Sequence, residues 1–263
     1  MCATHSMQLH RENHSPRLNR LLAALPQEDY ERLRPDLELV SLPLGWTLHR
    51  AGDAETHLYF PISGVVSRYH VTEDGASAAY AVTGNEGVIG VALFLGDAST
   101  PNQAEVLIAG FAYRLGVARL HSEFGHVGAL PLLLLRYTQA LIVQTTQTSV
   151  CNRHHSVPQQ FCRWLLACLD RMPSNELAMT QEKIADMLGV RREGITAAAG
   201  HLQKSGAIQY HRGHISVLDR AALEAQACEC YAVVSSEIDR LIPPHRTATP
   251  PPVESVRFAM LSS

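Results

Sequence analysis

Residues 180–204 read TQEKIADMLGVRREGITAAAGHLQK and have the pattern of two short helices joined by a tight turn. Thr180 is a suitable N-cap, because its hydroxyl can accept a hydrogen bond from a backbone N–H in the first turn. Gly189 suits the turn, since a residue without Cβ adopts a left-handed conformation at low cost. The positions expected to face inward recur at helical spacing and are Ile184, Ala185, Leu188, Val190, Ile195, Ala198 and Leu202. This pattern predicts a helix-turn-helix; the alternative is an ordinary helical hairpin inside a core.

The residues that follow favour the first interpretation. Ser205-Gly206 ends the second helix, and residues 207–210 and 214–218 alternate like two short strands. His211-Arg212-Gly213 lies between them as a tight turn. Helix, turn, helix and hairpin in this order predict a winged helix.

The second helix of this motif begins with charged residues on its outward face. Arg191, Arg192 and Glu193 can reach base edges in a DNA major groove from this position. The alternative for Arg192 and Glu193 is a surface ion pair. The candidate DNA-contacting residues are Thr180, Arg191, Arg192, Glu193, Thr196, His201, His211 and Arg212.

Charge is distributed unevenly along the 263 residues, whose net charge is −3. Residues 21–150 hold seven Lys and Arg against 13 Asp and Glu, whereas residues 157–220 hold eight against six. The C-terminal part is therefore the expected nucleic-acid surface. A hydrophobic fraction of 46% and a charged fraction of 18% are typical of a globular protein. We find no signal-peptide pattern, and residues 130–143 are too short and polar to span a bilayer, so a cytoplasmic protein without membrane contact is expected.

The six cysteines do not form paired CxxC motifs. Cys228 and Cys230 are too close together to chelate zinc by themselves, and no histidine follows at zinc-finger spacing. The best metal candidate is Cys151 with His154 and His155, which share a helix face. We expect structural thiols and no metal site.

Residues 37–120 have a different pattern, in which short β-rich runs are separated by glycines. This spacing predicts an antiparallel sandwich or barrel. Glu73-Asp74-Gly75 is a suitable hairpin turn. The predicted strands are residues 39–42, 46–49, 58–60, 65–71, 78–82, 88–95, 104–109 and 111–117.

A long helix is predicted over about residues 131–152, and residues 137–152 contain no Asp, Glu, Lys or Arg. An uncharged helix of this length must pack on something. Its apolar and hydroxyl residues recur near a 3.5-residue period, which favours a seam between two helices. Burial against the chain's own β domain is the alternative, and both arrangements are compatible. The predicted dimer interface is Leu134, Leu135, Thr138, Leu141, Ile142, Thr145 and Thr148.

The domain boundary falls at Ser156, where Ser156 and Gln159 form a predicted capping box and Pro158 lies in the first turn. The predicted class is α+β: an N-terminal antiparallel β-roll, a long dimerisation helix and a C-terminal winged helix-turn-helix. The predicted segments are a disordered tail (1–17), the β-roll (18–128), the long helix and hinge (129–155), the winged helix (156–220), a C-terminal helix (221–242) and a flexible tail (243–263).

This order of domains resembles the Crp/Fnr family of bacterial transcription regulators over about residues 18–232. The most specific matches are TQEKIADMLGVRRE, LYFPISGVVSRYHVTEDG and NEGVIGVALFLG. HSVPQQFCRWLLACLDR and ACECY resemble one branch of the family. The resemblance implies a homodimer whose recognition helices enter successive major grooves of a pseudo-palindromic DNA site, with RNA polymerase as a candidate partner. Ala197 and Gly194 depart from the family pattern, which implies fewer direct contacts in each half-site and leaves the operator sequence open.

The resemblance also implies an effector pocket in a β-roll that resembles a cyclic-nucleotide-binding jelly roll. Where cyclic-nucleotide-binding members have a Glu and an Arg, this chain has Val91 and either Asn102 or Gln103, and no Arg or Lys occurs between Arg68 and Arg114. A buried phosphate there lacks its strongest partner, so we do not expect cyclic AMP to bind. The degenerate pocket is predicted to comprise Gly90, Val91, Ala92, Asn102, Gln103 and Ala104. No cofactor is predicted, and the effector, if the protein has one, stays unknown.

Three function classes are weighed. The favoured one is a dimeric, sequence-specific DNA-binding regulator without catalysis. The second is a signalling module that uses the winged helix for protein contacts. The third, a cupin-like metalloenzyme, is disfavoured because residues 37–120 contain no HxH motif. A haem ligand among His49, His57, His70, His121 and His126 stays open, whereas an iron–sulfur cluster lacks nearby thiols in the N-terminal half.

Overall fold

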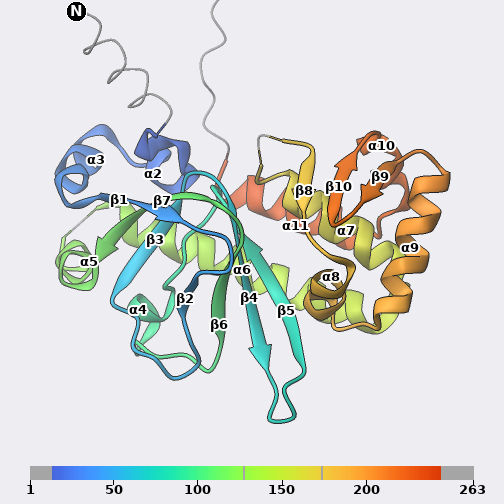
Figure 1. Cartoon of the computed structure of the whole chain (residues 1–263). Helices are drawn as coiled ribbons and strands as arrows, with labels where there is room; N and C mark the ends of the chain where they lie inside the picture. The colour runs from blue at the N-terminus through green and yellow to red at the C-terminus, as the bar shows by residue number, and fades with distance from the viewer. Residues whose placement is uncertain (1–13, 127, 173, 244–263) are drawn as a thin grey trace, which may run out of the picture.

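The computed structural model describes residues 14–126, 128–172 and 174–243. A β-rich N-terminal domain is followed by the long helix α6 (Ala129–His154) and then by a smaller domain of helices with a short sheet (Figure 1). No single described helix has the length and apolar character to cross a membrane. Only α5 (Val117–Phe124) and α6 taken together, with a 105° bend between them, meet that test.

Short helices at the N-terminus cover one end of the β domain. They are η1 (Pro16–Leu18), α2 (Arg20–Ala23), α3 (Gln27–Leu33) and η2 (Arg34–Asp36). The buried Asn19 caps α2 and donates to the carbonyl oxygens of Pro61 and Gly87. Residues 1–13 of the predicted tail lie outside the described residues. Residues 14–17 of that tail are ordered against the domain, since the Tyr113 hydroxyl donates to the His14 carbonyl at 2.7 Å.

Two antiparallel sheets form the β-roll, in the orders β1-β7-β3 and β2-β6-β4-β5. Gly75, with φ +85°, forms the predicted hairpin turn between β4 and β5. Buried residues from both sheets pack together and place a core between them, as the sequence predicts: Leu42, Val66, Ala104, Val106 and Ala112. The strands are β1 (Glu38–Leu42), β2 (Thr47–His49), β3 (His57–Pro61), β4 (Val65–Val71), β5 (Ser77–Thr83), β6 (Gln103–Ile108) and β7 (Gly110–Gly116).

The strand predicted at residues 88–95 is wrong. Ile89 forms a single bridge with Tyr59, and the chain then turns into α4 (Ala92–Leu95). Gly90 causes the turn: its φ is +104°, and a Cβ there would lie 2.8 Å from the His57 carbonyl oxygen. The apolar run 88–95 therefore fills space as a loop and a helical turn, which periodicity alone did not distinguish from a strand.

Helix α6 packs its inner face on its own β domain. Tyr137 is buried and its hydroxyl lies 2.8 Å from the Thr83 hydroxyl, while Gln144 donates to the Val82 carbonyl. The opposite face carries exposed apolar side chains, among them Leu135 and Ile142. Burial against the β domain thus uses one side of α6, and these apolar side chains stay exposed on the other.

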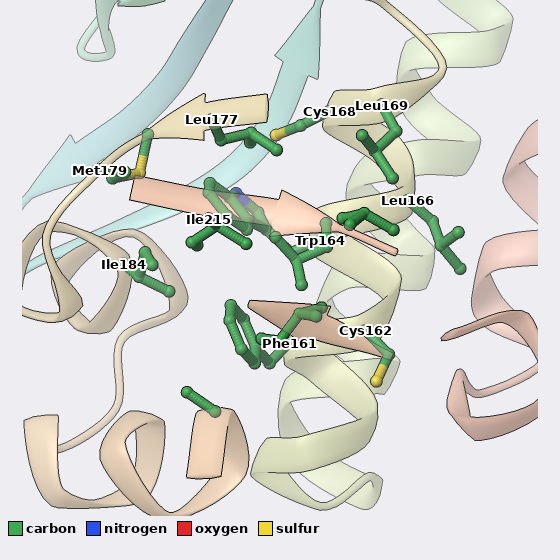
Figure 2. Packing of buried hydrophobic residues seen from close by; sticks show 14 of the residues in the cluster. Phe161, Cys162, Trp164, Leu166, Cys168, Leu169, Leu177, Met179, Ile184 and Ile215 are labelled. Carbon is green, nitrogen blue, oxygen red and sulfur yellow. The ribbon is translucent and has the colours of Figure 1, made fainter. Parts of the chain in front are cut away.

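The C-terminal domain is a winged helix, and its buried core, part of which is drawn in Figure 2, continues into the β-roll through Val65, Val82 and Leu107. Helix α7 (Val157–Leu169) begins at the predicted capping box and supplies Phe161 and Trp164 to that core. The sequence did not indicate strand β8, which pairs with β10. The remaining elements are β8 (Glu176–Ala178), α8 (Gln181–Leu188), α9 (Arg192–Lys204), β9 (Ile208–His211) and β10 (His214–Val217).

The single helix predicted at residues 221–242 is two helices. Asp219 caps α10 (Arg220–Gln226), as predicted, but the chain is extended at Ala227, with ψ 156°. A second helix, α11 (Cys230–Leu241), then runs back along α6 (Figure 1). The break lets α11 pack on α6, a tertiary contact that overrides helix propensity. Of the predicted tail 243–263, only residue 243 is described.

Candidate nucleic-acid interface

The N-terminal half of α9 presents charged and polar side chains to solvent. Arg191, Arg192, Glu193 and Thr196 are all exposed, and so is His201 one turn later. Neither Arg192 nor Glu193 forms an ion pair with any described residue. The surface ion pair that the sequence left open is therefore not formed, and both side chains are free to meet a partner.

The turn before α9 has the geometry that the sequence predicts. Gly189 is left-handed, with φ +65°, and Thr180 caps α8 by accepting from the Lys183 backbone N–H at 3.2 Å. The Thr196 hydroxyl donates to the Gln181 side chain at 2.6 Å, which ties α9 to the start of α8. Thr180 and Thr196 thus hold the two helices in place, beside any contact with a partner.

The wing is a two-residue hairpin with Arg212 and Gly213 at its turn. Both residues have positive φ, +48° and +81°, as a type I′ turn requires. Arg212 is the single described non-glycine residue with positive φ. His211 and Arg212 are exposed at the tip, and His214 joins them there. The sequence analysis did not include His214 among the candidate DNA-contacting residues, although its position directly after the turn could have indicated it.

The winged helix is docked on the β-roll through α8 and the end of α7. Lys183 pairs with Glu105 on β6 at 2.9 Å, and the Ser67 hydroxyl on β4 donates to the Met187 sulfur. Arg171 pairs with Glu86 at 2.8 Å, and both are buried. Burial disfavours the charged form of Arg171, yet the Glu86 carboxylate beside it keeps the pKa of the Arg171 guanidinium above its usual value. Because α8 lies between β5 and α9, this contact leaves the outer face of α9 open (Figure 1).

A cavity of about 530 Å³ lies between the β-roll and α6. Three of the predicted pocket residues line it: Val91, Ala92 and Asn102. Gln103 and Ala104 do not, since they lie on β6, where Ala104 is fully buried between the sheets. Gly90 lines a separate cavity of about 40 Å³, because its turn carries it toward β3. Three predicted pocket residues are thus placed elsewhere.

The larger cavity contains charged side chains that sequence reasoning missed. Arg68 projects from β4, is 4% exposed and donates to the Val88 carbonyl. Glu55 is buried beside His49, whose Nδ1 lies 3.0 Å from the carboxylate. Arg68 borders the stretch without Arg or Lys that precedes Arg114, and it reaches the cavity from β4. An alternating strand pattern around Arg68 was the signal that could have found it.

The predicted dimer residues divide into three groups on α6. Leu134 and Thr148 are buried within the chain, so they are not available to a second subunit and this part of the prediction is corrected. Thr138, Leu141 and Thr145 are half-buried and line the cavity. Leu135 and Ile142 remain exposed, by 50% and 61%, and Ile142 also lies at the edge of the cavity.

Seven of the exposed residues of α6 follow one another in steps of three and four, as in a helix that pairs with another helix. This exposed stripe consists of Leu132, Leu135, Gln139, Ile142, Thr146, Ser149 and Arg153. The dimer interface predicted from the sequence combined residues of this stripe with residues of the inner face, because α6 carries apolar side chains on both sides.

The two parts of the chain match two family models. Residues 39–124 match the cyclic nucleotide-binding domain, and residues 159–226 match the Crp-like helix-turn-helix domain. Together these matches cover more than half of the chain. A search of curated proteins by sequence found no match.

Solved structures share the fold at low sequence identity. FixK2 from Bradyrhizobium japonicum aligns with a TM-score of 0.62 and 18% identity, over 73% of this chain and 98% of that one. A putative Crp/Fnr regulator from Eubacterium rectale gives a TM-score of 0.61 and 18% identity, over 78% and 96%. The c-di-GMP-responsive regulator CLP from Xanthomonas campestris gives 0.58 and 18%, over 73% and 99%.

The fold, the exposed face of α9 and the two family-model matches all point to the same family. The chain belongs to the Crp/Fnr family of transcription regulators, and its winged helix is the DNA-binding domain.

Proposed function

We propose that the protein acts as a homodimer that binds a pseudo-palindromic site in double-stranded DNA and works in the cytoplasm by binding rather than catalysis. The observation that supports this most directly is the outer face of α9, where Arg192 and Glu193 are exposed and unpaired. Arg can donate to guanine O6 and N7 together, and Glu can accept from cytosine N4. The resulting control of transcription acts on access or recruitment of RNA polymerase.

Dimerisation is supported by the exposed stripe of α6. Its apolar members Leu132, Leu135 and Ile142 are each at least 50% exposed, and apolar residues in a 3-4 repeat are buried when two helices pair. A symmetric pair would present two α9 helices to successive major grooves, with half-sites about 34 Å apart.

The cavity between the β-roll and α6 is the proposed effector site. Val91 and Asn102 replace the family's carboxylate and guanidinium, so we propose that cyclic AMP is not the effector. Arg68 Nε and Glu55 Oε2 are buried without a hydrogen-bond partner among the described residues. These two atoms suit a small polar effector whose acidic group meets Arg68 and whose donor meets Glu55. Because Thr138, Leu141 and Thr145 of α6 also line the cavity, occupancy would bias the helix that carries the dimer.

Selection of bound sequences from random DNA tests the proposal, with the unmodified protein, Arg192→Ala and Arg50→Ala compared in parallel. Arg50 is exposed directly after β2 of the β-roll and serves as a matched control. The proposal expects the unmodified protein and the control to select a DNA motif with two-fold symmetry. Arg192→Ala should lose the base preference at fixed positions of that motif. Selection without any enriched motif, together with capture of a protein partner that survives Arg192→Ala, would support the signalling module instead.

A repeat of the selection with a metabolite extract tests the effector. Enrichment that depends on the extract and disappears in Arg68→Gln supports the cavity as the effector site. Saturable binding of cyclic AMP by the unmodified protein would contradict the proposal for this site.

A further inference from the structure

Three cysteines and one histidine meet where α6 ends and α11 begins. Cys151, Cys228 and Cys230 are buried, with 0%, 4% and 1% exposure, and form a cluster of their own. His155 adds its imidazole, and the four ligand atoms all lie within 4.8 Å of one another. We propose that these residues form a structural zinc site, and we name it the Cys₃His cluster.

The local geometry assembles the four side chains from two chain segments. Cys151 lies in the last turn of α6, and His155 is the C-cap of that helix, whose backbone N–H donates to the Cys151 carbonyl. The break between α10 and α11 brings Cys228 and Cys230 against them, which a continuous helix over residues 221–242 would not do. Cys228 and Cys230 are too close to form a zinc site alone, but here they need to supply only two of four ligands. His154, the third residue of the sequence-based metal set, is exposed and takes no part.

Two of the separations within the cluster are close to those around a tetrahedral zinc ion. Zn–S bonds near 2.3 Å and Zn–N bonds near 2.05 Å place two sulfurs about 3.8 Å apart, and sulfur and nitrogen about 3.6 Å apart. Cys151 Sγ and Cys228 Sγ are 3.5 Å apart, and Cys230 Sγ and His155 Nδ1 are 3.6 Å apart. Thiolates with imidazole in a closed, buried site are the donors of structural zinc.

The surroundings of the cluster match those of a metal ligand set. His155 Nδ1 points to Cys230, while its Nε2 lies 3.3 Å from the Glu229 carboxylate. A carboxylate on the outer nitrogen is the usual orientation of a zinc-bound histidine. Three thiolates and Zn²⁺ carry a net charge of −1, and the buried Arg163 guanidinium lies beside Cys151 to balance it. Arg163 Nε has no hydrogen-bond partner in the described part of the chain.

Zinc at this position would hold both connections of the winged helix at one point. Cys151 and His155 directly precede α7, and Cys228 and Cys230 directly follow α10, so the ion closes a segment of 77 residues that contains the whole domain. The metal would thereby fix the DNA-binding domain to the end of α6. The proposal concerns metal content and does not depend on the proposed DNA site.

The test is the metal content of the full chain, purified without a histidine tag or chelating resin. All variants carry Cys2→Ser, so that the cysteine outside the described residues makes no contribution. We expect about one zinc per chain, its release by a chelator together with a fall in Tm, and replacement by cobalt with the visible absorption of tetrahedral thiolate coordination.

The variants Cys151→Ser, Cys230→Ser and His155→Ala should lose the zinc. The controls Cys168→Ser, a buried thiol elsewhere on α7, and His154→Ala should keep it. If the cysteine variants do not fold, His155→Ala and cobalt binding by the unmodified chain still decide the question. A chain that binds neither zinc nor cobalt, a disulfide between Cys151 and Cys228 in the purified protein, or bound iron in place of zinc would overturn the proposal.

Discussion

The outer face of α9 and the seam between the winged helix and the β-roll both carry charged side chains, but in opposite environments. At the seam, Glu86 and Arg171 are buried and paired at 2.8 Å. On α9, Arg192 and Glu193 are exposed and make no ion pair with a described residue. Charges that hold this fold together are therefore matched within the chain, and those left unmatched on a rigid helix are available for DNA.

The apolar side chains of α6 are likewise divided between a buried face and an exposed face. We expect the largest effect from a substitution on the exposed face. Ile142→Glu removes two buried isoleucines from the proposed dimer, about 1.5–3 kcal/mol each, and places two like charges together. Sedimentation should show a monomer at micromolar concentration, where the unmodified protein is a dimer. Leu44→Glu, at a residue 64% exposed in the turn before β2, is the control and should stay dimeric. A dimer that survives Ile142→Glu would remove the exposed stripe from the interface.

The seam comes next in magnitude. Glu86→Ala leaves the buried Arg171 without its partner, so the free energy of unfolding should fall by about 3–5 kcal/mol. Denaturant unfolding measures this change, with Glu73→Ala in the exposed β4–β5 turn as the control. Arg171→Met added to Glu86→Ala should recover much of the loss, because the uncompensated charge is then gone. No recovery would mean that the pair matters for packing alone.

The outer face of α9 should behave in the opposite way. Arg192→Ala should weaken binding to the selected DNA site by about 1–3 kcal/mol, which is roughly 5- to 150-fold in Kd. The unfolding free energy should change by no more than about 0.5 kcal/mol, because the side chain is exposed and makes no hydrogen bond or ion pair within the described chain. Fluorescence anisotropy and denaturant titration give the two numbers. A large stability loss would contradict the distinction between matched and free charges.

The smallest expected effect concerns Asp29, whose carboxylate accepts from the Ala129 N–H at the start of α6 at 2.7 Å. That hydrogen bond, followed by the one from Arg32, lowers the Asp29 pKa below 3.8. Its contribution is therefore complete above the unfolded pKa and is lost as the pH falls through the lower folded value. Asp29→Ala should cost about 1 kcal/mol at pH 7, as loss of a helix cap does.

Unfolding at pH 7 and near pH 2.5 measures the Asp29 effect. The difference between Asp29→Ala and the unmodified protein should shrink at the lower pH, whereas Glu28→Ala, an exposed neighbour, should be silent at both. A difference that does not depend on pH would assign the loss to packing rather than to the carboxylate.

Local sequence patterns were sufficient for the winged helix. The Thr180 cap, the left-handed Gly189 and the Ser156–Gln159 capping box each depend on neighbours within four residues, and the structure confirms all three. The β4–β5 hairpin was equally local. In the run 88–95, by contrast, the local apolar pattern suited a strand and a loop alike, and packing against β3 decided for the loop.

The sequence by itself determined two domains, the type of each and the exposed face of α9 that is proposed to meet DNA, because caps, turns and helical periodicity act over a few residues. Tertiary structure alone decided which side of α6 stays exposed, that Arg68 lines the cavity from β4, and that Cys228 and Cys230 meet Cys151 and His155. Each of these depends on contacts between segments tens of residues apart, and no local spacing encodes which segments will meet.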